Sequence, residues 1–247
     1  MSLSTDISGW IKRKMKEAKA EGVIVGLSGG LDSSCVGVLC KKALGKKVLG
    51  LILPCHSNPE DENLALFVAD KFNIKIEKIV LDSPYDKYLE ILPEGKKLAK
   101  ANLKPRLRML TLYYYANNLN YLVAGSGNKS ELSVGYYTKY GDAAVDMLPL
   151  GGLLKSEVRE LAKELGIPKE IIARVPTAGL WQGQTDEEEL GISYEDLDRA
   201  IIAIEKNKIA DFSNSKIINK VKRMIENSEH KRITPSIFIK NKGEKYR

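Results

Sequence analysis

One stretch near the N-terminus, GVIVGLSGGLDSSCVGVLC (22–40), limits the possible folds more than any other part of the sequence. An apolar run leads into a loop (26–34) with three glycines, three serines and one aspartate, and an apolar segment follows it. A strand, a glycine-rich turn and a helix present backbone N–H groups and the positive helix end at one point, which favours phosphate binding. The lysine of the Walker loop is absent. The kind of phosphate site therefore stays open, as does an ordinary turn capped by Ser33.

The pattern around this stretch predicts an α/β fold. Short apolar segments alternate with helical ones through the first half of the chain, which is typical of a doubly wound parallel sheet flanked by helices. Pro105 predicts a break or a helix start within the last helical segment. The strands are expected at 22–28, 46–54, 74–82 and 120–126, and the helices at 33–44, 59–72 and 96–119.

The C-terminal portion is expected to be helical. From residue 128 the sequence is rich in Gly, Tyr and Asp without sustained periodicity, and helices are expected later, at 156–166, 193–206 and 214–227. Thr185 and Glu188 have the spacing of a capping box, which predicts that the acidic run 186–189 opens a helix and is not itself a site. Without a repeat or an evident linker, the chain is expected to form one domain over residues 1–247.

Composition argues against several classes of protein. No run approaches eighteen apolar residues, so no membrane span is expected, and the amphipathic N-terminal segment is expected to be a helix packed on the body. Cys35, Cys40 and Cys55 form no CxxC pair, which favours a reducing cytoplasm over a structural zinc site. The net charge of +7 suggests an anionic partner. A small phosphorylated substrate is favoured over nucleic acid, because the sequence has no block of basic residues separate from acidic ones.

The loop SGGLDS (28–33) resembles the pyrophosphate loop of the N-type ATP pyrophosphatases, which cut ATP between its α- and β-phosphates and leave an adenylate on the substrate. Further segments narrow the resemblance. They are NLKPRLRMLTLYY (102–114), GSGNKSE (125–131), GYYTKYGDAAVD (135–146), PLGGLLKSEVR (149–159), PTAGLWQGQTDEEELG (176–191) and HKR (230–232). In order and spacing they resemble the ammonia-dependent NAD synthetases over essentially the whole chain, and this resemblance implies the Rossmann-like fold of the adenine nucleotide α-hydrolases.

The resemblance implies an ATP site on the loop and a magnesium site beside it. Asp32 and Glu131 match the family's Mg²⁺-binding carboxylates, and hard oxygen ligands suit this ion. Lys155 matches a phosphate-contacting lysine of the family. It would supply, from a distant part of the sequence, the positive charge that the loop lacks. Taken singly, each of these is also an ordinary helix or surface residue. The residues implied to bind ATP are Gly26, Leu27, Ser28, Gly29, Gly30, Leu31, Asp32, Ser33, Ser34, Lys155 and Thr177.

A second group of residues is implied to bind deamido-NAD. Tyrosine rings can stack on a pyridine ring, and arginine and lysine suit a carboxylate or a diphosphate. Asp142 or Asp146 could attract ammonium or take its proton, since only neutral ammonia is nucleophilic. With Asp32 and Lys155, Asp142 is expected to be catalytic. The substrate-binding residues implied by the resemblance are Asn102, Arg106, Tyr136, Lys139, Asp142 and Asp146.

The chain departs from the family pattern at a few positions. Ala143 and Ala144 stand where many relatives have two glycines, and Ile52 stands where some have an arginine that meets ATP. His230 is given no catalytic role, because a charge at a helix end explains it. The segment before the acidic run resembles a mobile cover that keeps water from the adenylate.

The expected function is therefore amidation of deamido-NAD by ammonia, driven by ATP, in a cytoplasmic homodimer with the substrate site at the subunit interface. A chain of 247 residues leaves no room for an added glutaminase domain, so free ammonia is the expected nitrogen source. An RNA-modifying ATP pyrophosphatase would suit the basic charge, but this chain lacks the paired cysteines that the thiolating members use and shows no evident RNA-binding appendage. A nucleotide sensor without chemistry is disfavoured by the presence of Asp32, Glu131 and Lys155.

Overall fold

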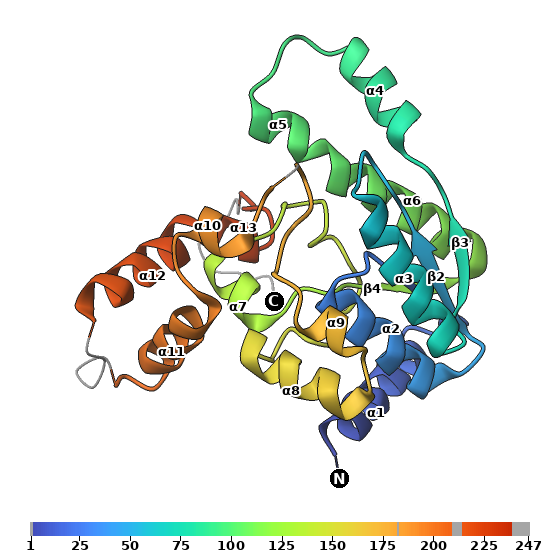
Figure 1. Cartoon of the computed structure of the whole chain (residues 1–247), viewed down its shortest axis with the longest axis horizontal. Helices are drawn as coiled ribbons and strands as arrows, with labels where there is room; N and C mark the ends of the chain where they lie inside the picture. The colour runs from blue at the N-terminus through green and yellow to red at the C-terminus, as the bar shows by residue number, and fades with distance from the viewer. Residues whose placement is uncertain (1, 182, 209–213, 239–247) are drawn as a thin grey trace.

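Four short parallel strands form the centre of the molecule. The computed structural model describes residues 2–181, 183–208 and 214–238. The strands β1 (Gly22–Gly26), β2 (Val48–Ile52), β3 (Lys75–Lys78) and β4 (Tyr121–Ala124) are arranged in the order β3-β2-β1-β4 (Figure 1). This is the predicted doubly wound sheet, and each strand is shorter than its predicted segment.

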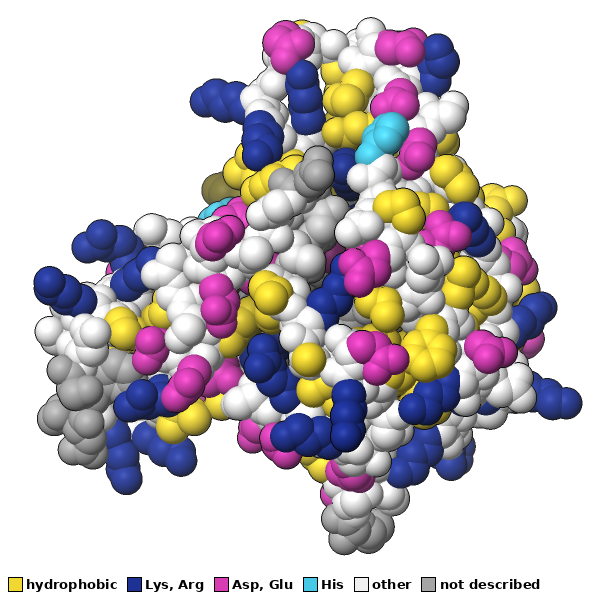
Figure 2. All heavy atoms as spheres, in the orientation of Figure 1, with side chains coloured by type: hydrophobic (Ala, Val, Ile, Leu, Met, Phe, Trp, Pro, Cys, Tyr) yellow, Lys and Arg dark blue, Asp and Glu magenta, His cyan; other side chains and the backbone are white. Residues whose placement is uncertain are grey.

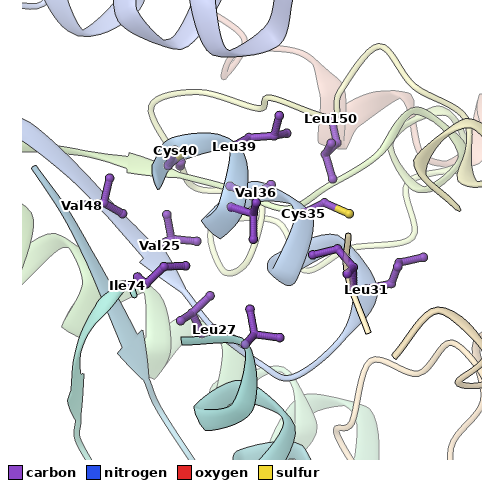
Figure 3. Packing of buried hydrophobic residues seen from close by; sticks show 14 of the residues in the cluster. Val25, Leu27, Leu31, Cys35, Val36, Leu39, Cys40, Val48, Ile74 and Leu150 are labelled. Atoms are coloured by element: carbon purple, nitrogen blue, oxygen red, sulfur yellow. The ribbon is translucent and has the colours of Figure 1, made fainter. Parts of the chain in front are cut away.

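Helices cover both faces of the sheet because successive strand residues point to opposite sides. Val23 and Val25 face a core shared with α1 (Leu3–Glu17), α2 (Leu31–Leu44), α3 (Pro59–Lys71) and α8 (Lys155–Leu165) (Figure 3). Ile24, between them, faces a core shared with α4 (Asp82–Glu90) and α6 (Leu103–Leu119). The three cysteines are free and buried in these two cores.

A third apolar core lies outside the sheet. It joins α7 (Lys129–Val134) and α10 (Asp186–Leu190) to α11 (Tyr194–Glu205) and α12 (Ser215–Asn227), with Leu197, Ile201 and Val221 at its centre. In Figure 1 the helices α10, α11, α12 and α13 (Glu229–Arg232) lie to one side of the sheet, beyond α7 and α8. The predicted helical C-terminal portion is thus present, and it reaches the sheet layer through α7 and α8.

Several predicted boundaries need correction. The helix expected at 96–119 is two helices, α5 (Lys97–Ala101) and α6, and the break lies at Asn102. Pro105 is the third residue of α6, where its missing N–H belongs to the first turn and costs no helical hydrogen bond. The segment after residue 128, expected to be irregular, contains α7. Sequence periodicity also missed α4 and the short helices α9 (Lys169–Ile172) and α13.

The strand order places a crevice at one edge of the sheet. The chain runs from β1 to β2 and β3 on one side, and then crosses to β4 on the other side of β1. The loops after β1 and β4 therefore diverge at the carboxyl edge, which is where open α/β sheets bind ligands. No helix among the described residues is long and apolar enough to cross a membrane.

Candidate active site

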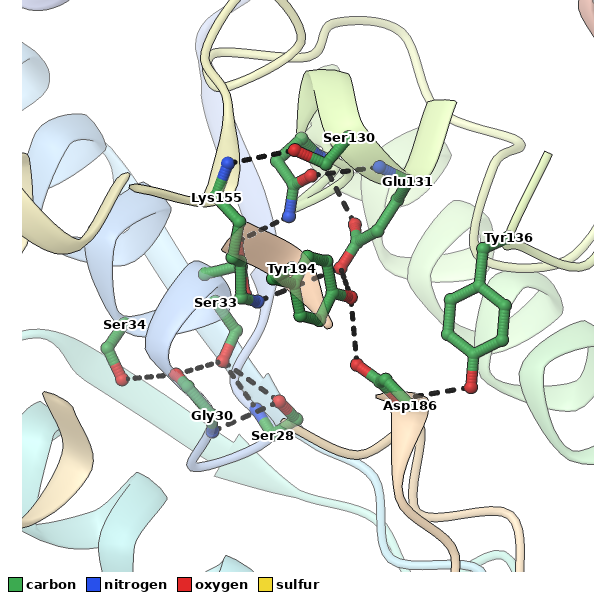
Figure 4. A network of polar contacts seen from close by, with 12 residues as sticks. Ser28, Gly30, Ser33, Ser34, Ser130, Glu131, Tyr136, Lys155, Asp186 and Tyr194 are labelled. Atoms are coloured by element: carbon green, nitrogen blue, oxygen red, sulfur yellow. Dashed lines mark hydrogen bonds and ion pairs between the residues drawn. The ribbon is translucent and has the colours of Figure 1, made fainter. Parts of the chain in front are cut away.

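The loop after β1 has a conformation that its glycines and serines allow. Gly29 has φ +77°, and a Cβ there would lie 2.1 Å from the carbonyl oxygen of Asp61 in α3, so only glycine fits. The Ser33 hydroxyl contacts the Ser28 hydroxyl at 2.9 Å and accepts the Ser28 N–H at 3.2 Å (Figure 4). α2 then begins at Leu31 with Gly30 as its uncapped N-cap residue. Its first N–H groups therefore remain available for an anion.

A cavity of about 650 Å³ opens beside this loop, within the size range of small-molecule sites. Most of the residues predicted to form the site lie along its wall. From the loop these are Gly26, Leu27, Ser28, Gly30, Leu31, Asp32 and Ser33, and from the rest of the chain Asn102, Arg106, Glu131, Tyr136, Lys139, Asp142, Lys155 and Thr177.

Three predicted residues do not line the cavity. Gly29 faces α3, and the Ser34 hydroxyl donates to the Gly30 carbonyl oxygen at 2.7 Å within the first turn of α2. Asp146 lies on the outside, where its carboxylate accepts the Val123 N–H at 2.7 Å and the Tyr113 hydroxyl at 3.1 Å. Within one chain, Asp146 is therefore separate from the other predicted substrate residues.

Asp32, Glu131 and Lys155 meet although they come from distant parts of the sequence. The Lys155 ammonium forms an ion pair with Asp32 and lies 3.8 Å from a Glu131 oxygen, and its side chain is only 4% exposed. Asn128 joins the two carboxylates: its amide nitrogen donates to Asp32 at 3.0 Å, and its backbone N–H donates to the Glu131 carboxylate at 3.1 Å. From the sequence, no role is assigned to Asn128. Its spacing from Glu131, which forms a capping box here, was the signal that could have revealed its role.

Burial and charge shift the pKa values of this cluster. Burial, together with the nearby Asp32 charge, raises the pKa of Glu131 to about 8 although the Lys155 charge opposes this. For Lys155, burial lowers the pKa, but the attraction of Asp32 and Glu131 outweighs burial and the pKa lies above its ordinary value. Lys155 is therefore a cation at neutral pH. The cluster places a fixed positive charge and two oxygen ligands next to the loop.

The acidic run at the start of α10 both opens a helix and reaches the cavity. Thr185 caps α10 as predicted, accepting the Glu188 N–H at 3.4 Å. Asp186 is nevertheless buried, and it receives hydrogen bonds from Tyr194 at 3.0 Å and from Tyr136 at 3.1 Å (Figure 4). The prediction that these acids only form a helix was therefore incomplete. A capping pattern does not show where the side chain after the cap points.

The predicted substrate residues gather around the loop that follows α7. Thr138 donates from its hydroxyl to Asn102 at 2.8 Å and from its N–H to Asp142 at 2.9 Å. Lys139 binds the carbonyl oxygen of His230, and Arg106 donates to the Lys139 carbonyl oxygen at 3.3 Å. Burial raises the pKa of the Asp142 carboxyl, although hydrogen bonds from Thr138 oppose this. Asp142 is thus a stronger base than an ordinary aspartate.

Lys231 and Arg108 are further cations that line the cavity. Lys231 lines the cavity next to His230, and its ammonium donates to the carbonyl oxygens of Gly135 at 2.7 Å and Tyr137 at 2.9 Å. Arg108 also lines the cavity, at the end of β2 where Ile52 replaces the arginine of some relatives. It donates to the Leu53 carbonyl oxygen at 3.0 Å and to the Ser57 hydroxyl at 3.1 Å. A guanidinium from α6 therefore occupies this end of the sheet.

The segment from Pro176 to Trp181 borders the cavity and is held from outside it. The Lys104 ammonium in α6 donates to the Leu180 carbonyl oxygen at 2.9 Å, and the Lys97 ammonium lies 4.3 Å from the centre of the Trp181 ring. Thr177 is exposed and accepts the Gly179 N–H at 3.1 Å. These contacts hold the predicted cover against α5 and α6.

The chain is similar to known proteins over most of its length. Residues 3–235 match the family model described as NAD synthase. An NH(3)-dependent NAD(+) synthetase of Carboxydothermus hydrogenoformans is 49% identical, with 92% of this chain and 93% of the relative covered. One of Methanocaldococcus jannaschii is also 49% identical, with 93% of each chain covered.

Solved structures agree with this. An NMN synthetase from Francisella tularensis has a TM-score of 0.88 and 35% identity, covering 97% of this chain and 98% of its own. An NH3-dependent NAD synthetase from Campylobacter jejuni has a TM-score of 0.84 and 31% identity, covering 97% of this chain and 100% of its own.

Proposed function

The chain belongs to the NAD synthase family, and from this premise we propose that it is an AMP-forming ligase that amidates deamido-NAD with ammonia in the last step of NAD biosynthesis. The observation that carries the proposal is the convergence of Asp32, Glu131 and Lys155 beside an anion-binding loop, in a cavity large enough for a nucleotide. The whole chain would act as one catalytic domain.

The first step forms an acyl-adenylate. A carboxylate oxygen of the nicotinate attacks the α-phosphorus of ATP, and the bond from that phosphorus to the pyrophosphate breaks. The loop 26–34 would hold the departing pyrophosphate through N–H groups at the start of α2 and the nearby hydroxyls. Lys155, a cation at neutral pH, would add the charge that stabilises it. No side chain needs to form a covalent bond, so positioning and charge do the work.

Asp32 and Glu131 would hold Mg²⁺. Among the described residues, no group of three or more His, Cys, Asp or Glu side chains is placed to hold a metal. Two convergent carboxylates nevertheless suit this ion, which usually binds through one or two carboxylates together with substrate phosphates. When bound, Mg²⁺ would neutralise charge on the triphosphate. The fit rests on the shared contact of both carboxylates with Lys155 and Asn128.

In the second step the nitrogen of ammonia attacks the acyl carbon, and AMP leaves as the amide forms. Asp142 is proposed to take the proton of ammonium, because its pKa is raised and it faces the cavity. The segment Pro176–Trp181 would keep water from the adenylate while ammonia enters. We propose that Arg108 contacts ATP in place of the arginine that some relatives have at the position of Ile52.

We further propose a homodimer in which deamido-NAD binds between the subunits. Asp146 lies outside the cavity of its own chain, so it can serve a bound substrate only from a neighbouring copy. The side chains of Leu110 and Tyr114, one turn apart on α6, are 59% and 66% exposed, which suits a covered face. We also propose that the reaction takes place in the cytoplasm, where the three free thiols would stay reduced.

The test is a reaction with ATP, Mg²⁺, deamido-NAD and ammonium, in which NAD and AMP are measured. Equal amounts of NAD and AMP are expected, and omission of any one component should abolish NAD formation. Binding of ATP without formation of either product would contradict the synthetase and favour a nucleotide sensor. Salt-dependent binding of tRNA would favour the RNA-modifying alternative.

The likeness to an NMN synthetase favours one specific second candidate, amidation of nicotinate mononucleotide. The two reactions share the nicotinate carboxylate and differ in the adenylyl half of the substrate. A parallel assay with nicotinate mononucleotide decides between them through kcat/KM for each substrate. We expect the ratio to favour deamido-NAD, and a ratio that favours the mononucleotide would reassign the substrate.

A further inference from the structure

A buried carboxylate behind the reaction centre links the C-terminal helices to it. Asp198 lies on α11, one turn after Tyr194, and is 4% exposed. It does not line the cavity. One of its oxygens accepts the hydroxyl of Ser130, and the other accepts the N–H of Ser156 at 2.9 Å. Both serines adjoin residues of the centre: Ser130 precedes Glu131, and Ser156 follows Lys155.

These contacts satisfy the start of α8. Its N-cap residue is Leu154, whose side chain has no oxygen to accept the free N–H groups of the first turn. The Leu154 N–H is met by Glu157 at 2.8 Å, and the Lys155 N–H is met by the Ser130 hydroxyl oxygen at 2.9 Å. Asp198 accepts the third of these N–H groups, that of Ser156. The backbone of Lys155 is thus fixed by side chains from α7 and α11, and not by a cap of its own.

The same helix contacts the other side of the centre. The Tyr194 hydroxyl donates to Asp186 and lies 3.4 Å from Glu131, and the Lys155 ammonium lies 5.1 Å from the Tyr194 ring centre. Tyr194 and Asp198 are four residues apart, so they lie on one face of α11. α11 packs against both α7 and α8, and in Figure 4 the Tyr194 ring lies among Ser130, Glu131 and Lys155.

We propose that Asp198 is a positioning residue for adenylate formation: through Ser130 and the first turn of α8 it sets the distance between Lys155 and Glu131. The proposal rests on the proposed function and goes beyond it, since it makes α11 part of the catalytic apparatus without contact with either substrate. Asp198 holds the backbones from which Lys155 and Glu131 extend. A displacement of about 1 Å at such a centre can lower a rate about 100-fold.

The test measures the first step alone, as deamido-NAD-dependent exchange of labelled pyrophosphate into ATP without ammonium. In Asp198→Ala and in Ser130→Ala, the exchange rate at saturating substrates should fall roughly 30- to 100-fold. The KM values for ATP and deamido-NAD should change by less than about threefold, because neither residue touches substrate. Glu195→Gln is the matched control, since it removes an exposed carboxylate from the same helix, and it should keep the wild-type rate.

A double-mutant comparison separates positioning from folding. If Asp198 acts through Lys155, Asp198→Ala should lower the rate of Lys155→Ala by less than about threefold, although it lowers the wild-type rate strongly. Equal loss in both backgrounds, or loss that only follows the folded fraction measured by circular dichroism, would overturn the proposal. Asp198→Asn, which keeps one acceptor oxygen, replaces the alanine variant if that variant does not fold, and a wild-type rate there would also overturn it.

Failure of the proposed function gives a different result. A wild-type protein that exchanges no pyrophosphate in the presence of deamido-NAD contradicts the synthetase itself. An active wild type with an equally active Asp198→Ala contradicts only the positioning role.

Discussion

Asp32 is the residue on which three separate parts of the chain converge. It is the second residue of α2, it forms an ion pair with Lys155 of α8, and it accepts a hydrogen bond from Asn128 ahead of α7. Its position at the start of α2 is fixed by the loop, whereas its partners lie 96 and 123 residues away in sequence. Such a residue can be changed to an isostere to test chemistry with little effect on packing.

Asp32→Asn should therefore abolish most adenylate formation while the protein still folds. The variant loses the charge that pairs with Lys155 and the oxygen ligand proposed for Mg²⁺, and we expect kcat/KM to fall about 10²- to 10³-fold. Pyrophosphate release with deamido-NAD is the measurement. Asp70→Asn, an exposed aspartate on α3, is the control. Near-normal turnover in Asp32→Asn would rule out its role as a metal ligand.

Asp142 should connect stability to pH. Burial raises its pKa in the folded protein, so the folded state holds the proton more tightly than the unfolded state. The resulting stabilisation is fully present below the unfolded pKa and is lost as pH rises through the folded pKa. Asp142→Asn keeps the acceptor for the Thr138 N–H and does not titrate. Its urea midpoint relative to wild type should therefore rise as pH is raised from the acidic range to neutrality.

The same variant should lose activity at neutral pH. If Asp142 takes the proton of ammonium, its removal should lower kcat for NAD formation about 10²-fold. Pyrophosphate exchange without ammonium should stay close to wild type. A constant stability difference across pH would contradict the raised pKa, and unchanged kcat would leave the proton to another group.

At the scale of elements, the segment Pro176–Trp181 depends on contacts outside the cavity. Lys104 does not line the cavity, and burial lowers its pKa, so its charge is costly where it lies. Its hydrogen bond to Leu180 is its link to the segment. Replacing it with an apolar side chain of similar length removes that link and also removes a desolvated charge.

Lys104→Met should therefore loosen the cover without unfolding the protein. Water would reach the adenylate more often, so AMP should form in excess of NAD, whereas wild type should give equal amounts. The measurement is the ratio of AMP to NAD at limiting ammonium. Lys96→Met, an exposed lysine at the start of α5, is the control and should keep the ratio at one. A ratio of one in Lys104→Met would show that the segment does not protect the intermediate through this contact.

Elements defined by local sequence were predictable, and those defined by long-range contacts were not. The loop 26–34 and the four strands follow from apolar runs and glycine chemistry, and Thr185 identifies the start of α10. The contact of Asn128 with Asp32 and that of Asp198 with Ser130 have no local pattern, because the partners lie 96 and 68 residues away. The apolar contacts of α7 with α11 and α12, rather than periodicity, make a helix of six residues stable.

At the scale of the whole molecule, charged side chains of both signs are interspersed. On the face shown in Figure 2, Lys and Arg side chains are scattered among Asp and Glu and form no continuous stripe. Leu110 and Tyr114 are among the exposed apolar side chains and lie one turn apart on α6. Asp146 accepts the hydroxyl of Tyr113 from the same helix. Asp146 thus lies beside α6, and in the proposed homodimer it would serve the cavity of the neighbouring copy.

This arrangement predicts complementation between inactive subunits. If Asp146 serves the cavity of the neighbouring copy, a dimer of one Asp32→Asn chain and one Asp146→Asn chain contains one intact site, with Asp32 from one chain and Asp146 from the other. Random exchange makes half of the dimers mixed, so about a quarter of wild-type activity should return when the two inactive variants are combined. Differently tagged chains allow the mixed dimer to be isolated and its activity measured. A mixed dimer that forms without recovering activity would place Asp146 and Asp32 in the same chain's site, and a monomer at assay concentration would contradict the interfacial site altogether.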